Sequence, residues 1–183
     1  MDGPRINRAL ARLSSEVVEE NHGAGDLFLV GIRRRGVPLA ERMAQKIADL
    51  EGYRPPVGVL DITLYRDDLS TVGAKPVVNR TDLPGDIENR NIVLIDDVLY
   101  TGRTIRAALD ELIDFGRPSR IQLCALVDRG GRELPIQPDF VGLRAAAGPD
   151  ESVQVRLREE DGDDRVVLLG PARAQASRRR GGR

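Results

Sequence analysis

The chain has 183 residues, of which 40% are hydrophobic and 31% are charged, as is ordinary for a globular domain in water. Its apolar runs are only a few residues long, which excludes a membrane-spanning helix, and no secretory signal follows the first charges. The single cysteine, Cys124, lies in an apolar run and cannot form an internal disulfide. We therefore expect a cytoplasmic protein.

The net charge of −1 conceals an asymmetry, because residues 171–183 carry five arginines and no acidic residue. Without these five, 23 basic residues face 29 acidic ones. Attraction of a nucleic acid by the overall field of the protein is thereby excluded, and only a local basic patch would serve.

The hydrophobic pattern predicts helices and strands in alternation, as in an α/β domain around a mostly parallel sheet. Ile6, Leu10, Leu13 and Val17 recur at helical spacing, which predicts a first amphipathic helix ending near 21–23. The elements expected after it are a strand at 27–32, a helix at 38–50, strands at 57–64 and 92–95, a helix at 104–115, a strand at 121–127, and a peripheral strand pair near 153–157 and 166–169. We expect residues 1–170 to form a single domain and 171–183 a disordered basic tail.

The most informative segment is a strand, an acidic pair and a turn into a helix, with the sequence Ile92-Val93-Leu94-Ile95-Asp96-Asp97-Val98-Leu99-Tyr100-Thr101-Gly102-Arg103-Thr104. Ligands of open α/β sheets bind beyond the carboxyl ends of the strands, and a helix N-terminus favours a phosphate group. Two adjacent carboxylates suit sugar hydroxyls, a magnesium ion or a positive charge developing on a sugar. The alternative is a capped helix beside a solvated acidic pair.

This segment closely resembles the motif for 5-phosphoribosyl-1-pyrophosphate (PRPP) of type I phosphoribosyltransferases. The resemblance implies that residues 101–104 hold the 5′-phosphate, while Asp96 and Asp97 contact the ribose and, through PRPP or water, Mg²⁺. As pyrophosphate leaves, the ribose becomes oxocarbenium-like, so catalysis rests on positioning and electrostatics.

Three further segments fit the same resemblance. Gly31-Ile32-Arg33-Arg34-Arg35-Gly36 resembles the pyrophosphate loop, although a solvated turn is the alternative. The long connection after Asp61 resembles a mobile lid, with Arg66 as the cation for the leaving group and an exposed charge cluster as the alternative. The base-side residues would be Asp128, Arg129, Phe140 and Val141. Asp128 stands where 6-oxopurine enzymes carry a lysine, which disfavours such purines, but it is equally suited to cap a turn.

Together these segments resemble the PyrR family, bifunctional pyrimidine-operon regulators and uracil phosphoribosyltransferases, from about Ile6 to Leu169. The resemblance implies that uracil and PRPP, with Mg²⁺, give UMP and pyrophosphate. It also implies binding of pyrimidine-operon mRNA when UMP or UTP is bound, and assembly into a homo-oligomer. The alternatives are an RNA-binding nucleotide sensor with little catalysis, or a phosphoribosyltransferase that uses another base.

The sequence supports the surface needed for RNA binding only in part. Arg5, Arg8 and Arg12 share one helical stripe, although Arg12 can instead pair with Glu16 at i,i+4. Arg132 and Arg144 lie on the loops near the base-side segment. Four positions depart from the family pattern, namely Arg34, Gly131, Leu143 and Arg144.

Overall fold

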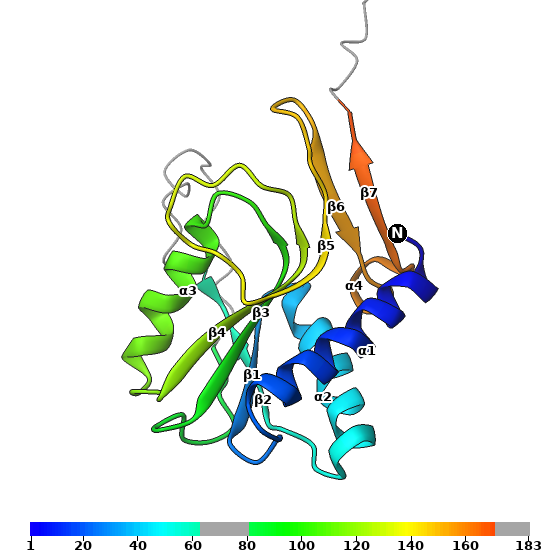
Figure 1. The fold of residues 1–183 in the computed structure, drawn as a ribbon. Helices are drawn as coiled ribbons and strands as arrows, with labels where there is room; N and C mark the ends of the chain where they lie inside the picture. Colours follow the sequence, from blue (N-terminus) through cyan, green and yellow to red (C-terminus); the bar gives the residue numbers. More distant parts are fainter. Residues whose placement is uncertain (63–80, 171–183) are drawn as a thin grey trace, which may run out of the picture.

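The computed structural model describes residues 1–62 and 81–170 (Figure 1). Its centre is a five-stranded sheet in the order β2-β1-β3-β4-β5, in which every neighbouring pair is parallel. The strands are β1 (Leu27–Ile32), β2 (Val57–Leu60), β3 (Asn91–Leu99), β4 (Arg120–Asp128) and β5 (Phe140–Arg144). The predicted α/β class with a mostly parallel sheet is confirmed.

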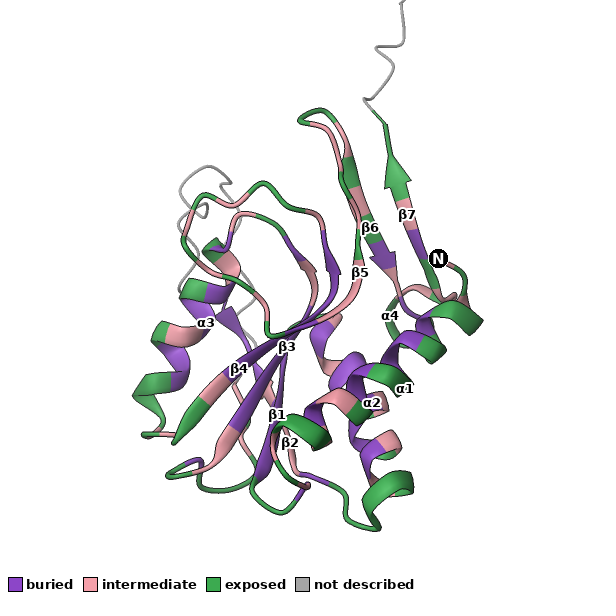
Figure 2. Ribbon diagram, in the orientation of Figure 1, coloured by how far each residue is buried: buried purple, intermediate pink, exposed green. Residues whose placement is uncertain are grey.

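Helices cover both faces of this sheet, and Figure 2 shows the purple strands enclosed between them. On one face lie α1 (Gly3–Glu20) and α2 (Gly36–Glu51), and on the other lies α3 (Arg103–Asp114). Because side chains alternate along a strand, Leu29 and Val93 pack with α1 and α2. Val30 and Leu94 pack with Ile105 of α3. Burial on both faces explains why the strands read as continuous apolar runs.

A smaller unit stands beside the sheet, next to the N-terminus (Figure 1). It consists of β6 (Ser152–Arg156), the short helix α4 (Arg158–Asp161) and β7 (Arg165–Leu169), with β6 and β7 antiparallel. The amino group of Met1 donates to the carbonyl oxygen of Val166 at 2.7 Å. The predicted peripheral strand pair is confirmed.

Four elements differ from the sequence predictions. β2 ends at Leu60, whereas the pattern predicted a strand at 57–64, and α4 was not predicted. β3 continues through the acidic pair to Leu99, whereas the pattern predicted its end at Ile95. β5 was not predicted as a strand, because its residues are mostly half-buried and lack an apolar period. Within residues 1–62 and 81–170, no helix combines the length and the apolar character needed to cross a membrane.

Candidate active site

The acidic pair lies at the carboxyl edge of the sheet, inside the last part of β3. Pairing of β1 with β3 ends at Gly31 opposite Ile95, whereas pairing of β3 with β4 continues to Leu99 opposite Asp128. Four residues of β3 therefore extend beyond its last pair with β1. Asp96 and Asp97 stand at this step, where one neighbouring strand has given way to the arginine loop (residues 31–36).

Burial dominates the electrostatics of the pair. Asp96 is 6% exposed, and its Oδ1 accepts a hydrogen bond from the N–H of Asp97 at 2.9 Å. Burial raises the pKa of Asp96 well above its usual range, and the charge of Asp97 raises it further. Burial also raises the pKa of Asp97, against the charge of Arg35. Among the described residues neither carboxylate has a salt bridge, so the pair favours an incoming cation or hydroxyl donors.

The turn after β3 exposes a helix N-terminus. Gly102 precedes α3 with φ +92°, a left-handed conformation that glycine adopts without strain. It offers no side-chain cap, and the first turn of α3 contains no acidic residue. Thr101 Oγ1 accepts a hydrogen bond from the N–H of Arg103 at 3.3 Å. The phosphate loop (residues 101–104) therefore presents N–H groups and the positive end of a helix dipole, which suit a phosphate.

A cover loop (residues 129–136) folds against the phosphate loop. The N–H groups of Glu133 and Leu134 donate to the carbonyl oxygen of Thr101 at 3.0 and 3.1 Å. Leu134 and Ile136 pack beside Gly102, 3.4 Å from where a β-carbon would stand. The geometry of the phosphate loop thus depends on a segment about thirty residues downstream.

Arg132, which the sequence offered as a candidate RNA contact, fastens this cover loop. Its guanidinium donates to the carbonyl oxygens of Tyr100 and Ile136, both at 2.9 Å, and to Asp128 at 2.8 Å. The Arg132 side chain is only 13% exposed. Because its N–H groups are used inside the protein, Arg132 is a structural residue here.

Asp128 takes the turn-capping role that was the alternative to base contact. Its Oδ1 accepts from the N–H of Gly130 at 3.0 Å and from Arg132, and Arg144 approaches to 3.5 Å. Burial raises the pKa of Asp128, but these hydrogen bonds and charges outweigh burial and leave the pKa lowered. Asp128 is therefore an ionised loop anchor at neutral pH.

The other base-side residues separate in space. The Arg129 guanidinium stacks on the Tyr100 ring, 3.8 Å from its centroid, and so lies beside the phosphate loop. A β-carbon at Gly131 would lie 2.5 Å from the same ring. Phe140, which the sequence placed on the base side, lies opposite Cys124 in the sheet register and is buried in the core. It sits roughly 13 Å before the end of β4, at a rise of about 3.3 Å per residue.

The arginine loop is pressed against β3 just before the acidic pair. A β-carbon on Gly36 would lie 2.3 Å from the carbonyl oxygen of Ile95, and one on Gly31 would lie 2.5 Å from Val37 Cα. Only glycine permits this approach. The loop contains a cis peptide bond between Arg33 and Arg34.

The three loop arginines have different surroundings. Arg33 and Arg34 are both exposed, and Arg33 Nε lies 3.8 Å from Oδ2 of the buried Asp61. Arg35 forms two hydrogen bonds with Asp161 of α4. Asp161 was missed in the sequence, because nothing in the sequence links a carboxylate 126 residues away to this loop. Arg66 lies outside the described residues, as do residues 171–183.

The three arginines of the stripe on α1 also differ in their contacts. Arg12 pairs with Glu16 at 2.6 Å, and its Nη2 donates to the carbonyl oxygens of Val141 and Gly142. All three arginines are exposed, but only Arg12 joins α1 to β5. Arg144 is also largely exposed, at 75% of its side chain.

Comparison with known proteins shows to which class of protein the chain belongs. The family model described as phosphoribosyl transferase domain matches residues 1–158, so this is a phosphoribosyltransferase domain. Solved structures agree in fold. The hypoxanthine phosphoribosyltransferase of Trypanosoma cruzi has a TM-score of 0.69 at 16% identity, covering 93% of this chain and 95% of its own. A purine phosphoribosyltransferase from Pyrococcus horikoshii has a TM-score of 0.60 at 23% identity, covering 80% and 85%.

More similar relatives narrow the class. Proteins named bifunctional protein PyrR include one from Chloroflexus aurantiacus, 60% identical and covering 92% of this chain and 93% of its own. Another, from Pelotomaculum thermopropionicum, is 56% identical and covers 94% and 95%. A third, from Thermus thermophilus, is 58% identical and covers 92% and 93%. The chain belongs to the PyrR family.

Proposed function

We propose that the chain transfers the phosphoribosyl group of PRPP to uracil, forming UMP and pyrophosphate, and that it binds pyrimidine-operon mRNA when UMP or UTP occupies the site. One observation carries the enzymatic part. The buried carboxylate of Asp96 and the half-buried carboxylate of Asp97 stand between the N-terminus of α3, which begins without an acidic residue, and the arginine loop. Membership of the family named bifunctional supports the second activity.

In the proposed reaction each part of PRPP meets a different element. The phosphate loop holds the 5′-phosphate with N–H groups and the Thr101 and Thr104 hydroxyls. Asp96 and Asp97 accept hydrogen bonds from the ribose hydroxyls, and their negative charge stabilises the positive charge that develops on the ribose. The arginine loop supplies guanidinium groups to the departing pyrophosphate. No protein nucleophile is needed, so the rate comes from positioning and charge.

Mg²⁺ fits this donor set when PRPP supplies most of the oxygen ligands. The described residues contain no group of three potential metal-ligating side chains, and the acidic pair offers two carboxylates. Mg²⁺ commonly binds in this way, through one or two carboxylates together with substrate phosphates. When bound, it would supply positive charge to the leaving pyrophosphate.

Uracil is the base supported best. At the end of β4, where 6-oxopurine enzymes carry a lysine, this chain has Asp128, and its carboxylate is bound by Arg132. The lysine that would contact a purine oxygen is therefore replaced by a carboxylate whose charge is balanced by Arg132. Family membership points to the same base.

The test is pyrophosphate release from PRPP by the full chain, with uracil or hypoxanthine as acceptor. We expect Mg²⁺-dependent release with uracil and none above background with hypoxanthine, and a chelator should abolish it. Turnover with hypoxanthine but not with uracil would overturn the choice of base.

The RNA activity is tested by gel shift against the leader RNA of a pyrimidine operon, with and without UMP. Arg5→Gln and Arg8→Gln should weaken binding and each reduce the slope of log affinity against log salt by about 1. Arg120→Gln is the matched control, because Arg120 is paired with Glu20 on the surface. Binding that UMP does not enhance would reject the regulatory role.

A further inference from the structure

The unit of β6, α4 and β7 (the hairpin unit) is firmly attached to α2. Leu157, between β6 and α4, is fully buried in the same core as α1 and α2. Arg42 of α2 binds Glu159 at 2.6 Å and Asp164 at 2.7 Å. Because α2 begins at Gly36, the hairpin unit is held next to the arginine loop.

From this unit Asp161 reaches the arginine loop. Arg35 Nε donates to Asp161 Oδ2 at 3.0 Å, and Arg35 Nη2 donates to Oδ1 at 2.8 Å, a bidentate pair. Oδ2 also accepts from the N–H of Leu157 at 2.9 Å, so the carboxylate is fixed from two sides. The hydrogen bonds from Arg35 and Leu157 lower the pKa of Asp161 to about 2, which keeps it ionised at neutral pH.

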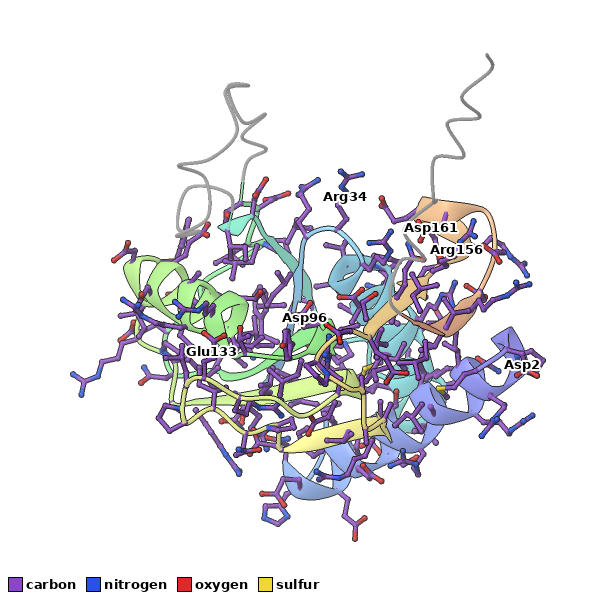
Figure 3. The ribbon with its side chains drawn as sticks, turned by 90° about the horizontal axis from the view of Figure 1, so that it is seen from above. Asp2, Arg34, Asp96, Glu133, Arg156 and Asp161 are labelled. Carbon is purple, nitrogen blue, oxygen red and sulfur yellow. The ribbon has the colours of Figure 1, made fainter. Side chains whose placement is uncertain are left out.

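Arg35 in turn lies within the field of the acidic pair. The hydrogen bond with Asp161 raises the pKa of Arg35, and the charge of Asp97 adds to the rise. A guanidinium has five N–H donors, of which Asp161 takes two. Within the described residues the others have no hydrogen-bond partner. Figure 3 shows Arg34, from the same loop, and Asp161 toward the same margin of the view, with Asp96 nearer its centre.

We propose that Asp161 is a positioning residue for the arginine loop. It fixes the Arg35 guanidinium beside the acidic pair, so that the remaining N–H groups meet the diphosphate of PRPP. Immobilising a free arginine costs rotamer entropy at the moment of binding, whereas a guanidinium already held by Asp161 has lost that entropy in advance. The inference rests on the proposed function, since it assumes that PRPP binds at this edge.

The test compares Asp161→Asn with Glu159→Gln in the full chain. Glu159 is the matched control, because it too is a carboxylate of the hairpin unit that binds an arginine. Its partner, however, is Arg42 of α2 and not a residue of the arginine loop. We expect Asp161→Asn to raise KM for PRPP, and Kd for pyrophosphate with Mg²⁺ measured by calorimetry, about tenfold, the scale of one charge-assisted hydrogen bond. KM for uracil should stay unchanged and kcat should change less than KM for PRPP. Glu159→Gln should leave KM for PRPP and Kd for pyrophosphate unchanged, whatever its effect on Tm.

An Arg35→Gln background shows whether Asp161 acts through Arg35. There Asp161→Asn should cause no further rise in KM for PRPP. An unchanged KM in the single Asp161→Asn variant, or a full additional tenfold rise in the Arg35→Gln background, would overturn this inference alone. A wild-type chain that binds neither PRPP nor pyrophosphate would instead overturn the proposed function.

Discussion

The Asp96 carboxyl group is desolvated without a compensating salt bridge among the described residues, so it should cost stability. Burial raises the pKa of Asp96 in the folded chain above its value in the unfolded chain. The group therefore destabilises the fold at a pH above the folded pKa, where it is charged, and not at a pH below the unfolded pKa. We therefore expect Asp96→Asn to raise Tm at pH 8 by at least roughly 2–4 °C, the shift that about 1 kcal/mol produces in a chain of this size.

This gain should shrink as the pH is lowered and wild-type Asp96 takes up its proton. Calorimetric melting between pH 4 and pH 8 measures it, with Asp110→Asn as control, because Asp110 is 55% exposed beside Arg106. A lower Tm for Asp96→Asn at pH 8 would contradict the account. The trade of stability for a charged site is common at functional positions.

Gly36 shows a second constraint at the scale of one residue. A methyl group there would clash with the carbonyl oxygen of Ile95, the residue before the acidic pair. We expect Gly36→Ala to lower the free energy of unfolding by about 1–3 kcal/mol, as overpacking does, and to raise KM for PRPP. Gly25→Ala is the control, because nothing lies within 4 Å of its β-carbon position. If Gly36→Ala and Gly25→Ala changed the free energy of unfolding and KM for PRPP by the same amounts, the close contact at Gly36 would be unimportant.

At the scale of elements, the cover loop depends on Arg132, which joins Tyr100, Asp128 and Ile136. Arg132→Met leaves Asp128 buried without its main partner, so we expect a loss of about 3 kcal/mol in the free energy of unfolding and a higher KM for PRPP. Urea unfolding measures the loss, and Arg120→Gln, on an exposed pair, should cost less than about 1 kcal/mol.

The pH dependence of this loss follows from Asp128, whose pKa is lowered in the fold. A lowered pKa adds stability above the unfolded value of about 4 and loses it as the pH falls through the folded value. The difference between wild type and Arg132→Met should therefore be full at pH 7 and diminish below pH 4. A difference that grows in acid would exclude the pair as its source.

The same elements show how far the sequence pattern reaches. Apolar runs predicted β1 and β4 to within a few residues, because burial on both faces leaves a strong signal, and helical spacing predicted α1, α2 and α3. The pattern ended β3 at Ile95, since carboxylates break an apolar run, although backbone pairing with β4 carries the strand on to Leu99. β5 lies at the edge of the sheet and is half-buried, so its sequence has no clear period.

At the scale of the whole molecule, local motifs predicted the acidic pair, the phosphate loop and the arginine loop, because each is a contiguous segment at one sheet edge. Contacts between distant segments were not predictable. The sequence did not predict that Arg132 would fasten the cover loop or that Phe140 would lie in the core, and the RNA and base contacts expected of them stay predictions. Assembly into a homo-oligomer stays a prediction from the family resemblance.

Every role proposed for the loops at this edge requires that PRPP binds at the carboxyl edge of the sheet around Asp96 and Asp97. Isothermal titration of PRPP with Mg²⁺ into the wild-type chain and into Asp97→Asn, without any base present, tests it directly. We expect saturable binding by the wild type and a loss of at least roughly tenfold in affinity for the variant, about 1.4 kcal/mol. Equal affinity in the two proteins, with turnover intact, would contradict the assignment of the acidic pair.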